Sequence, residues 1–135
     1  MQVLGFILGH LVGDYLFQNE FMAVNKVKKD MLGWFACLSH SIVYTIWLVL
    51  FLYLFNRHDV VNWSLLFVLI FLTHFPIDKW SLGKYWLKFI KGNKTIPTEG
   101  PAYPIYWFVY IVADNTLHFL LMTLVLMQWF PSLLK

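Results

Sequence analysis

Three His/Asp pairs, each with a spacing of four residues, lie in apolar parts of this chain. They are His10 and Asp14, His74 and Asp78, and Asp114 and His118; a further histidine, His40, lies in another apolar segment. Four residues make about one turn of an α-helix, so the two side chains of a pair share one helix face. Imidazole and carboxylate groups are ligands of zinc, manganese and iron. These seven side chains are therefore the candidate metal ligands.

Ionisable side chains are costly inside apolar segments. A charged group at the centre of a bilayer costs roughly 2.5–3.5 kcal/mol on insertion scales, so it usually has a partner or a function. A single His/Asp pair is compatible with a buried ion-pair network that holds helices in register. Burying three such pairs and His40 would cost much desolvation free energy, which is difficult to explain if the residues only hold helices in register. We favour metal binding, and a proton or ion pathway and a purely structural network remain the alternatives.

The segments that position these residues are those of an integral membrane protein. Of the 135 residues, 60% are hydrophobic and 13% are charged, against about 25% charged in soluble domains. The length suits a single domain. The sequence predicts an all-α fold, an integral membrane four-helix bundle with spans at about 3–17, 34–55, 60–77 and 103–130. An amphipathic helix on the membrane surface is expected at 79–91, between the third and fourth spans.

Lysine placement predicts the orientation. The two long polar connections hold Lys26, Lys28, Lys29, Lys79, Lys84, Lys88, Lys91 and Lys94, whereas the opposite side has only Arg57 and Lys135. The positive-inside rule therefore places both connections in the cytoplasm and both termini outside, in the inner membrane. The same rule explains the lysines without nucleic-acid binding. At about 1.5 Å per helical residue, the candidate ligands can meet in the cytoplasmic half of the bundle.

Small residues predict close packing of the first span. Gly5, Gly9 and Gly13 form a stripe along it, which allows a neighbouring helix to approach its backbone. His10 and Asp14 lie on the adjacent face of the same helix. We interpret the stripe as a packing surface. This is compatible with metal binding, because the helix that packs there would place its own candidate ligands next to His10 and Asp14.

The stretches HLVGDYLFQNEFMAVNK, HFPID and DNTLH, with the region around His40, resemble the DUF3307 family of small bacterial and phage membrane proteins. Its members share an H-x-x-x-D followed by Leu/Phe-Gln and Asn-Lys, a second H-x-x-x-D and a D-x-x-x-H. The resemblance covers nearly the whole chain and implies roles for Gln18, Asn25 and Lys26, which we expect in substrate binding. The family is similar to proteins labelled as membrane-bound metal-dependent hydrolases, which implies hydrolysis. This chain departs in having Pro76 inside the second motif, where proline can kink a helix.

The expected function is an integral membrane hydrolase of a phosphoester or another ester at the cytoplasmic membrane surface. It would use one or two divalent ions, with zinc expected first and manganese or iron as alternatives. Asp78 and Asp114 are the candidate catalytic residues, with Asp78, at the mouth of the site, as the candidate general base. Lys84, Lys88 and Lys91 would bind an anionic lipid headgroup, or they serve only as topology signals.

Two other functions remain open at this stage. An ion- or proton-coupled transporter with four spans would have to oligomerise, and a small membrane interaction or chaperone subunit would bind a larger partner. A transport path requires polar groups that continue to the outer side of the membrane. The outer halves of the second, third and fourth spans are almost entirely Leu, Val, Ile and Phe, which favours the enzyme. Membrane lipids are the expected partners, and the sequence leaves the oligomeric state open.

Overall fold

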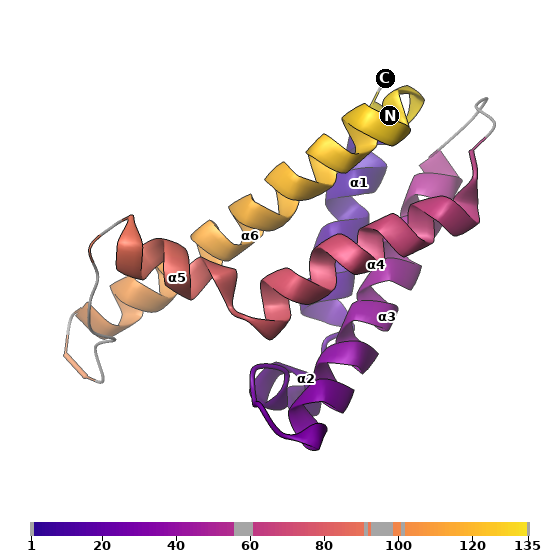
Figure 1. Cartoon of the computed structure of the whole chain (residues 1–135). Helices are drawn as coiled ribbons and strands as arrows, with labels where there is room; N and C mark the ends of the chain where they lie inside the picture. The colour runs from indigo at the N-terminus through magenta and orange to yellow at the C-terminus, as the bar shows by residue number, and fades with distance from the viewer. Residues whose placement is uncertain (1, 56–60, 91, 93–98, 101, 135) are drawn as a thin grey trace.

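The computed structural model describes residues 2–55, 61–90, 92, 99–100 and 102–134, and this part of the chain is helical and contains no strand. The helices are α1 (Gln2–Leu11), α2 (Glu20–Asn25), α3 (Met31–Phe55), α4 (Trp63–Lys79), α5 (Leu82–Phe89) and α6 (Ala102–Trp129) (Figure 1). A π-helical turn (Val12–Leu16) continues α1, and a 3-10 turn (Pro131–Leu134) follows α6. The predicted all-α fold class is confirmed for these residues.

Polar side chains set the starts of three helices. The Asn19 side chain accepts a hydrogen bond from the Met22 amide at the start of α2, and Asn62 accepts one from Leu65 at the start of α4. Asp30 accepts one from the Gly33 amide in the first turn of α3. Such side-chain oxygens satisfy amides that have no partner inside the helix. The polar connections therefore define where the apolar helices begin.

Two helices, α3 and α6, are each long and apolar enough to cross a membrane. A third crossing is present if α4 and α5 count as one broken span, with a bend of 54° between them. The apolar helix at the N-terminal end, Val3–Leu16, is shorter. The structure thus shows a helical protein with two or three candidate spans, and each of the four ranges predicted from the sequence falls on a helix.

The outer surface of the helices is apolar. Only 17% of the most apolar stretch of α6 is buried inside the protein. Large side chains on it, such as Ile105, Phe108 and Leu124, are exposed. On α3 the same holds for Phe35 and Leu54. Such surfaces suit a hydrocarbon environment, where helices are apolar all round.

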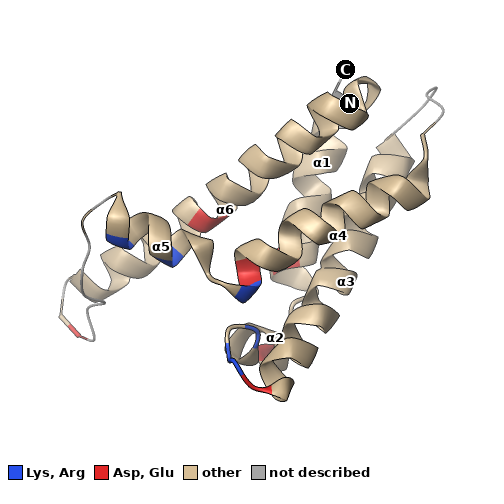
Figure 2. Ribbon diagram, viewed as in Figure 1, with Lys and Arg blue, Asp and Glu red and all other residues tan. Residues whose placement is uncertain are grey.

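In the described part of the chain, the charged residues are confined to one part of the molecule. Figure 2 shows them around α2, at the end of α4, on α5 and in the first half of α6. The opposite end, where α1 begins and α6 ends, carries none among the described residues. That end holds the apolar core, which is built from buried residues such as Phe6, Leu48, Leu66, Met122 and Leu126. The polar groups are therefore separated from an apolar half, as the lysine pattern predicts.

Glycines allow α1 to pack directly on α3. A Cβ atom at Gly9 would lie 2.9 Å from Leu48 Cα, and one at Gly13 would lie 3.0 Å from Tyr44 Cα. A Cβ atom at Gly5 would lie 2.8 Å from Phe55 Cβ and 3.0 Å from the Phe51 carbonyl oxygen. Because these neighbours include backbone atoms, a larger residue would force the two helices apart. The glycine stripe is a packing surface between α1 and α3.

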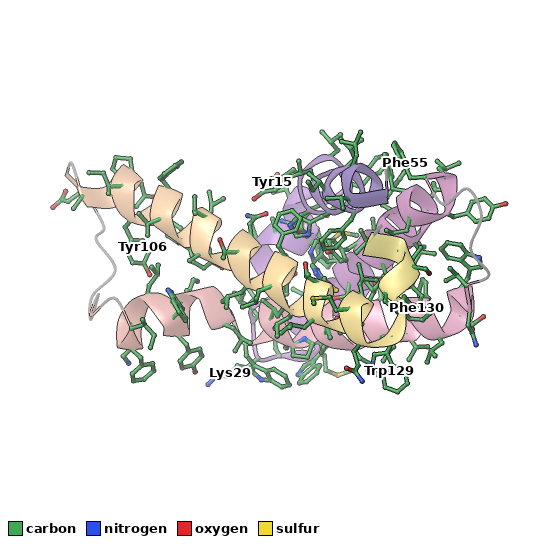
Figure 3. All side chains as sticks on the ribbon, turned by 90° about the horizontal axis from the view of Figure 1, so that it is seen from above. Tyr15, Lys29, Phe55, Tyr106, Trp129 and Phe130 are labelled. Atoms are coloured by element: carbon green, nitrogen blue, oxygen red, sulfur yellow. The ribbon has the colours of Figure 1, made fainter. Side chains whose placement is uncertain are left out.

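Helix α5 and the beginning of α6 project sideways from the other helices, as both Figure 1 and the view in Figure 3 show. The turn between α4 and α5 contains Ser81 in the left-handed region, with φ of 48°. Helix α4 itself is continuous through Pro76, and the 54° bend falls after it, between α4 and α5. At the start of α5, a Cβ atom on Gly83 would lie 2.8 Å from Asp114 Oδ1. This close approach brings α5 next to the acidic part of α6.

Candidate metal centre

Four segments bring histidine and aspartate side chains into one buried group. Asp14 comes from the π-helical turn, His40 from α3, His74 and Asp78 from α4, and Asp114 and His118 from α6. His40 and His74 are fully buried, and Asp78 and His118 are 3% and 1% exposed. The pairs from separate helices therefore meet in space, and only the side chains of Asp14 and Asp114 among these six are partly exposed, at 13% and 18%.

The most compact part of the group consists of four donor atoms. His40 Nε2 lies 2.8 Å from Asp78 Oδ2 and 3.3 Å from Asp14 Oδ1. His74 Nε2 lies 3.2 Å from His40 Nε2, 3.2 Å from Asp78 Oδ2 and 3.8 Å from Asp14 Oδ1. We call these four residues the inner cage.

These separations fit the ligand shell of a small divalent ion. Zinc bonds to nitrogen and oxygen are about 2.0–2.1 Å, which places the corners of a tetrahedron about 3.3–3.4 Å apart. Five of the six separations in the inner cage are given above, and they range from 2.8 to 3.8 Å. The buried Asp14 Oδ1 atom has no hydrogen-bond partner among the described residues. The inner cage therefore has both the spacing and an unused oxygen donor that an ion would need.

A second group of donors shares Asp78. His118 Nε2 lies 3.7 Å from Asp78 Oδ1, the oxygen on the other side of the carboxylate from the inner cage. Asp78, Asp114 and His118 each offer a donor atom within 4.8 Å of the others. We call these three residues the outer group. Asp78 has one oxygen directed toward each set.

The ring of His118 is oriented for ligation. Its Nδ1–H donates a hydrogen bond to the Asp114 carbonyl oxygen, at 2.9 Å. That bond places the proton on Nδ1 and leaves a lone pair on Nε2, which is the arrangement found in metal-binding histidines. His118 Nε2 and Asp114 Oδ1 are buried and have no hydrogen-bond partner among the described residues. Buried polar atoms that have no partner in the protein are rare, and a water molecule or an ion usually satisfies them. Within the described part of the chain, the buried Nδ1 atoms of His40 and His74 also have no hydrogen-bond partner.

His10 lies beside these ligand sets, and both its ring nitrogens are engaged. Its Nε2–H donates to Asn115 Oδ1 at 2.9 Å, and the Tyr44 hydroxyl donates to its Nδ1 at 2.8 Å. The ring also lies 3.5 Å from Asp14 Oδ2. No lone pair is left on His10 in this arrangement, so we assign it to positioning Asp14 and Asn115. The prediction that His10 itself binds the metal is therefore not supported by its place in the structure.

Tyr44 is a residue of the site that the sequence analysis did not single out. It is completely buried, its ring stacks on His74, and its hydroxyl bonds to His10. Its signal in the sequence was weak, because a tyrosine in an apolar span is common. Its spacing of four residues from His40 could have indicated a shared helix face.

The π-helical turn positions Asp14. The Phe17 amide donates to the Val12 carbonyl at 3.1 Å, five residues earlier, where an α-helix would use the residue four earlier. Such turns are rare and are frequently found at functional sites. The wider turn changes the direction of the side chains that follow α1. An ideal α-helical reading of the sequence did not reveal this feature.

Lys26 reaches the site from the end of α2. Its ammonium group donates to Asp78 Oδ2 at 2.8 Å and to Gln18 Oε1 at 3.0 Å. Burial lowers the pKa of Lys26, but the carboxylates of Asp78 and Asp14 outweigh burial and raise the pKa above its usual value. The group therefore remains charged. Asn25, in contrast, donates to the Phe21 carbonyl of its own helix.

Lys79 holds the same connection from the other side. Its ammonium group donates to the Lys28 carbonyl at 2.7 Å and lies 4.5 Å from the centroid of the Trp34 ring. It therefore ties the end of α4 to the loop between α2 and α3. With Lys26 on Asp78, two lysines fix the segment that covers the site.

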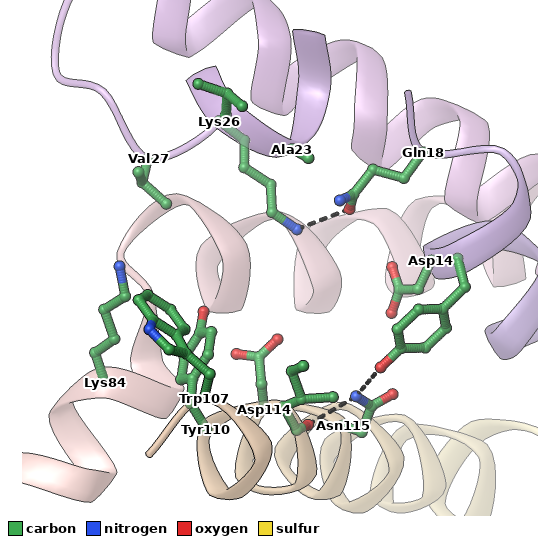
Figure 4. A pocket seen from close by; sticks show the side chains of 13 residues that line it. Asp14, Gln18, Ala23, Lys26, Val27, Lys84, Trp107, Tyr110, Asp114 and Asn115 are labelled. Atoms are coloured by element: carbon green, nitrogen blue, oxygen red, sulfur yellow. Dashed lines mark hydrogen bonds between the residues drawn. The ribbon is translucent and has the colours of Figure 1, made fainter. Parts of the chain in front are cut away.

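A pocket of about 380 Å³ opens beside the acidic residues. Asp14 and Asp114 lie on its walls, and Figure 4 shows Lys26 and Gln18 across from Asp114 and Lys84 at the end near Trp107. Pockets of this size hold small-molecule groups. Among the lysines predicted to bind substrate, Lys26 and Lys84 line this pocket. Lys88 lines a different groove, and Lys91 lies outside the described residues.

Comparison with known proteins identifies one family. The model of the family DUF3307, described as a protein of unknown function, matches residues 3–134. No curated protein and no solved structure matches the chain. The functional assignment therefore depends on the site itself.

Proposed function

Since the chain belongs to the DUF3307 family, whose description assigns no function, we propose from its site that it is an integral membrane metal-dependent hydrolase of a phosphoester or another ester. The observation that carries this proposal is the inner cage, in which five separations among four donor atoms are 2.8–3.8 Å, close to those of a tetrahedral ligand shell. The pocket beside it is lined by Asp14 of the inner cage and by Asp114, and a substrate would reach the site there.

The inner cage and the outer group would have different roles. Asp14, His40, His74 and Asp78 offer a closed set of four ligands, which is typical of a tightly held ion. Asp78, Asp114 and His118 offer three ligands, and Asp114 lies on the pocket wall. Three protein ligands and one open position are typical of catalytic zinc sites. Asp78 would bridge two ions, one per set, with zinc expected and manganese or iron as alternatives.

Charge balance supports a cation at this place. Three carboxylates and the Lys26 ammonium group leave two negative charges uncompensated when the histidines are neutral. Buried charges are costly unless they are paired, and one divalent ion would neutralise the group. A second ion would give the site a net positive charge, which favours an anionic substrate.

The chain's own residues supply the remaining chemistry. A divalent ion in the site would lower the pKa of a water molecule and polarise the ester bond. Asp114 lies on the pocket wall and outside the inner cage, and we assign it as the group that accepts the proton of the attacking water. Asp78 is held by His40 and Lys26 and serves as a ligand. His10 and Tyr44 keep Asp14 and His74 in place.

We further propose four spans in the inner membrane, with the site near the cytoplasmic face and both termini outside. Two observations support this topology: α1, α3, α4 and α6 coincide with the predicted ranges, and charged residues gather at the end that contains α2. The other half holds a packed apolar core. The described residues of that core are apolar apart from the hydroxyl group of Tyr44, which favours an enzyme over a transporter.

Metal analysis of the purified protein tests the proposal. Protein extracted in detergent should contain one or two transition-metal ions per chain, measured by inductively coupled plasma mass spectrometry. His74→Ala should lose most of the metal, because His74 belongs to the inner cage. His118→Ala should lose the second ion only. His58→Ala is the matched control, since His58 lies in the polar turn between the second and third predicted spans. Metal-free wild-type protein, or equal metal in all four proteins, would refute the proposal.

A further inference from the structure

The pocket has a second end, away from Asp14, that contains hydrogen-bond donors. Lys84, Trp107 and Tyr110 form this end, as Figure 4 shows. The Lys84 ammonium group lies 5.8 Å from the centroid of the Trp107 ring and 5.6 Å from that of Tyr110. The aromatic rings thus hold the lysine at the pocket through cation–π contacts. This end is chemically unlike the acidic end.

The donors at this end lack acceptors. The Trp107 indole nitrogen, which can only donate, is buried and has no hydrogen-bond partner among the described residues. Lys84 forms no ion pair with a carboxylate in the described part of the chain. Buried donors are nearly always satisfied, and their exceptions call for a ligand, an ion or a water. An anion in the pocket would satisfy both groups.

We propose that Lys84 and Trp107 bind the phosphate group of the substrate. A phosphate monoester carries up to two negative charges and three strong acceptor oxygens, which matches the ammonium groups of Lys26 and Lys84 and the Trp107 N–H. A carboxylate has only two oxygens for these three donors. This inference rests on the proposed hydrolase function and names its substrate class: a phosphate ester, either a lipid headgroup or a soluble compound.

Lys88 is a control that distinguishes specific phosphate binding by Lys84 from a general effect of basic residues on the protein surface. It lies one turn after Lys84 on the same helix, but its ammonium group lies over Phe89, at 5.4 Å. Lys88 lines a neighbouring groove that Lys84 also borders, and it does not line the pocket. If the lysines of α5 serve only to fix topology or to attract anionic lipids, Lys84 and Lys88 are equivalent. If the pocket binds phosphate, replacing Lys84 lowers the affinity for phosphate and replacing Lys88 does not. The pair therefore provides a matched comparison.

Equilibrium binding tests the inference. The full-length protein, purified in detergent with its metal, is titrated with inorganic phosphate and separately with dihexanoyl phosphatidic acid, by calorimetry. Lys84→Met should weaken binding about tenfold, and Trp107→Phe about threefold, because each removes a donor to the anion. Lys84→Arg should restore binding, and Lys88→Met and Trp86→Phe should match the wild type. Metal content and the thermal transition are measured for each variant, so that loss of folding is recognised.

The outcomes separate this inference from the proposed function. Phosphate binding that does not depend on Lys84, that falls equally in the Lys84 and Lys88 variants, or that is absent from metal-loaded wild-type protein would overturn the inference and leave the metal site standing. Protein that never contains metal would overturn the proposed function. Tighter binding of the lipid phosphate than of inorganic phosphate supports a headgroup substrate, and equal binding supports a soluble phosphate ester.

Discussion

The ring of Tyr44 stacks on the imidazole of His74, with centroids 3.6 Å apart and planes inclined by 11°. The same tyrosine bonds to His10 through its hydroxyl group, at 2.8 Å. One residue of α3 therefore fixes a histidine of α4 and a histidine of α1. Because Tyr44 is completely buried and lies against Gly13, it has little freedom to move. The packing of the apolar half and the geometry of the polar site meet at this residue.

Replacing Tyr44 separates its two contacts. Tyr44→Phe keeps the stacked ring but leaves His10 without one hydrogen bond, which should cost about 1–3 kcal/mol of stability and retain the metal. Tyr44→Leu also removes the stacked ring, so it should lower the metal content as well. Thermal unfolding and metal analysis in detergent measure both effects. Equal metal content in the two variants would show that the stacking does not position His74.

Asp78 and Asp114 should respond differently to removal of their charge. Asp78→Asn breaks a buried ion pair with Lys26 and removes a ligand of both donor sets, so it should destabilise the protein by about 3–5 kcal/mol and release the metal. Asp114→Asn should keep the ion of the inner cage and abolish hydrolysis of a phosphoester.

The double variant Lys26→Met/Asp78→Asn controls for the unpaired lysine. It should recover part of the stability that Asp78→Asn loses, because no buried charge remains without a partner. Metal content should stay low, since the ligand is still absent. Additive losses of stability in the double variant would contradict a direct coupling between Lys26 and Asp78.

The contact between α1 and α3 should be sensitive to one methyl group. Gly13→Ala places a Cβ atom 3.0 Å from the Tyr44 backbone, so the helices must separate, at a cost of about 1–3 kcal/mol. Because Asp14 follows directly, metal affinity should fall as well. Leu11→Ala, on an exposed position of the same helix, is the control and should leave metal content unchanged. The thermal midpoint and the metal content of the two variants test whether close packing of α1 on α3 at Gly13 is needed for stability and metal binding.

Cysteine labelling checks the proposed topology. In a Cys37→Ser background, single cysteines at Lys28 and Lys88 should react with an impermeant thiol reagent only after the cytoplasmic face is exposed, and a cysteine at Asn62 should react from outside. Cys37 is buried, so its removal should have little effect on labelling elsewhere. Labelling of Lys28 and Lys88 positions from opposite sides would rule out four spans.

Much of the helical arrangement was predictable because its causes are local. Apolar runs with polar connections predicted helices where α1, α3, α4 and α6 lie, and the alternation of lysines and aromatics predicted α5. The pairs His74/Asp78 and Asp114/His118 follow from helical spacing in the same way. The break at Ser81 and the π-helical turn around Asp14 were not predicted. Both depend on how the helices pack against one another in the folded protein, and the spacing of residues in the sequence does not specify that packing.

The sequence by itself determined which side chains are available and which helix face each pair occupies, because helical periodicity is a property of neighbouring residues. Only the tertiary structure decided which of them meet. It divided the candidates into the inner cage and the outer group, gave His10 hydrogen bonds to Asn115 and Tyr44, and placed Lys84 in the pocket and Lys88 outside it. The physical reason is that these contacts join residues distant in the chain, and the crossing and rotation of packed helices set their distances.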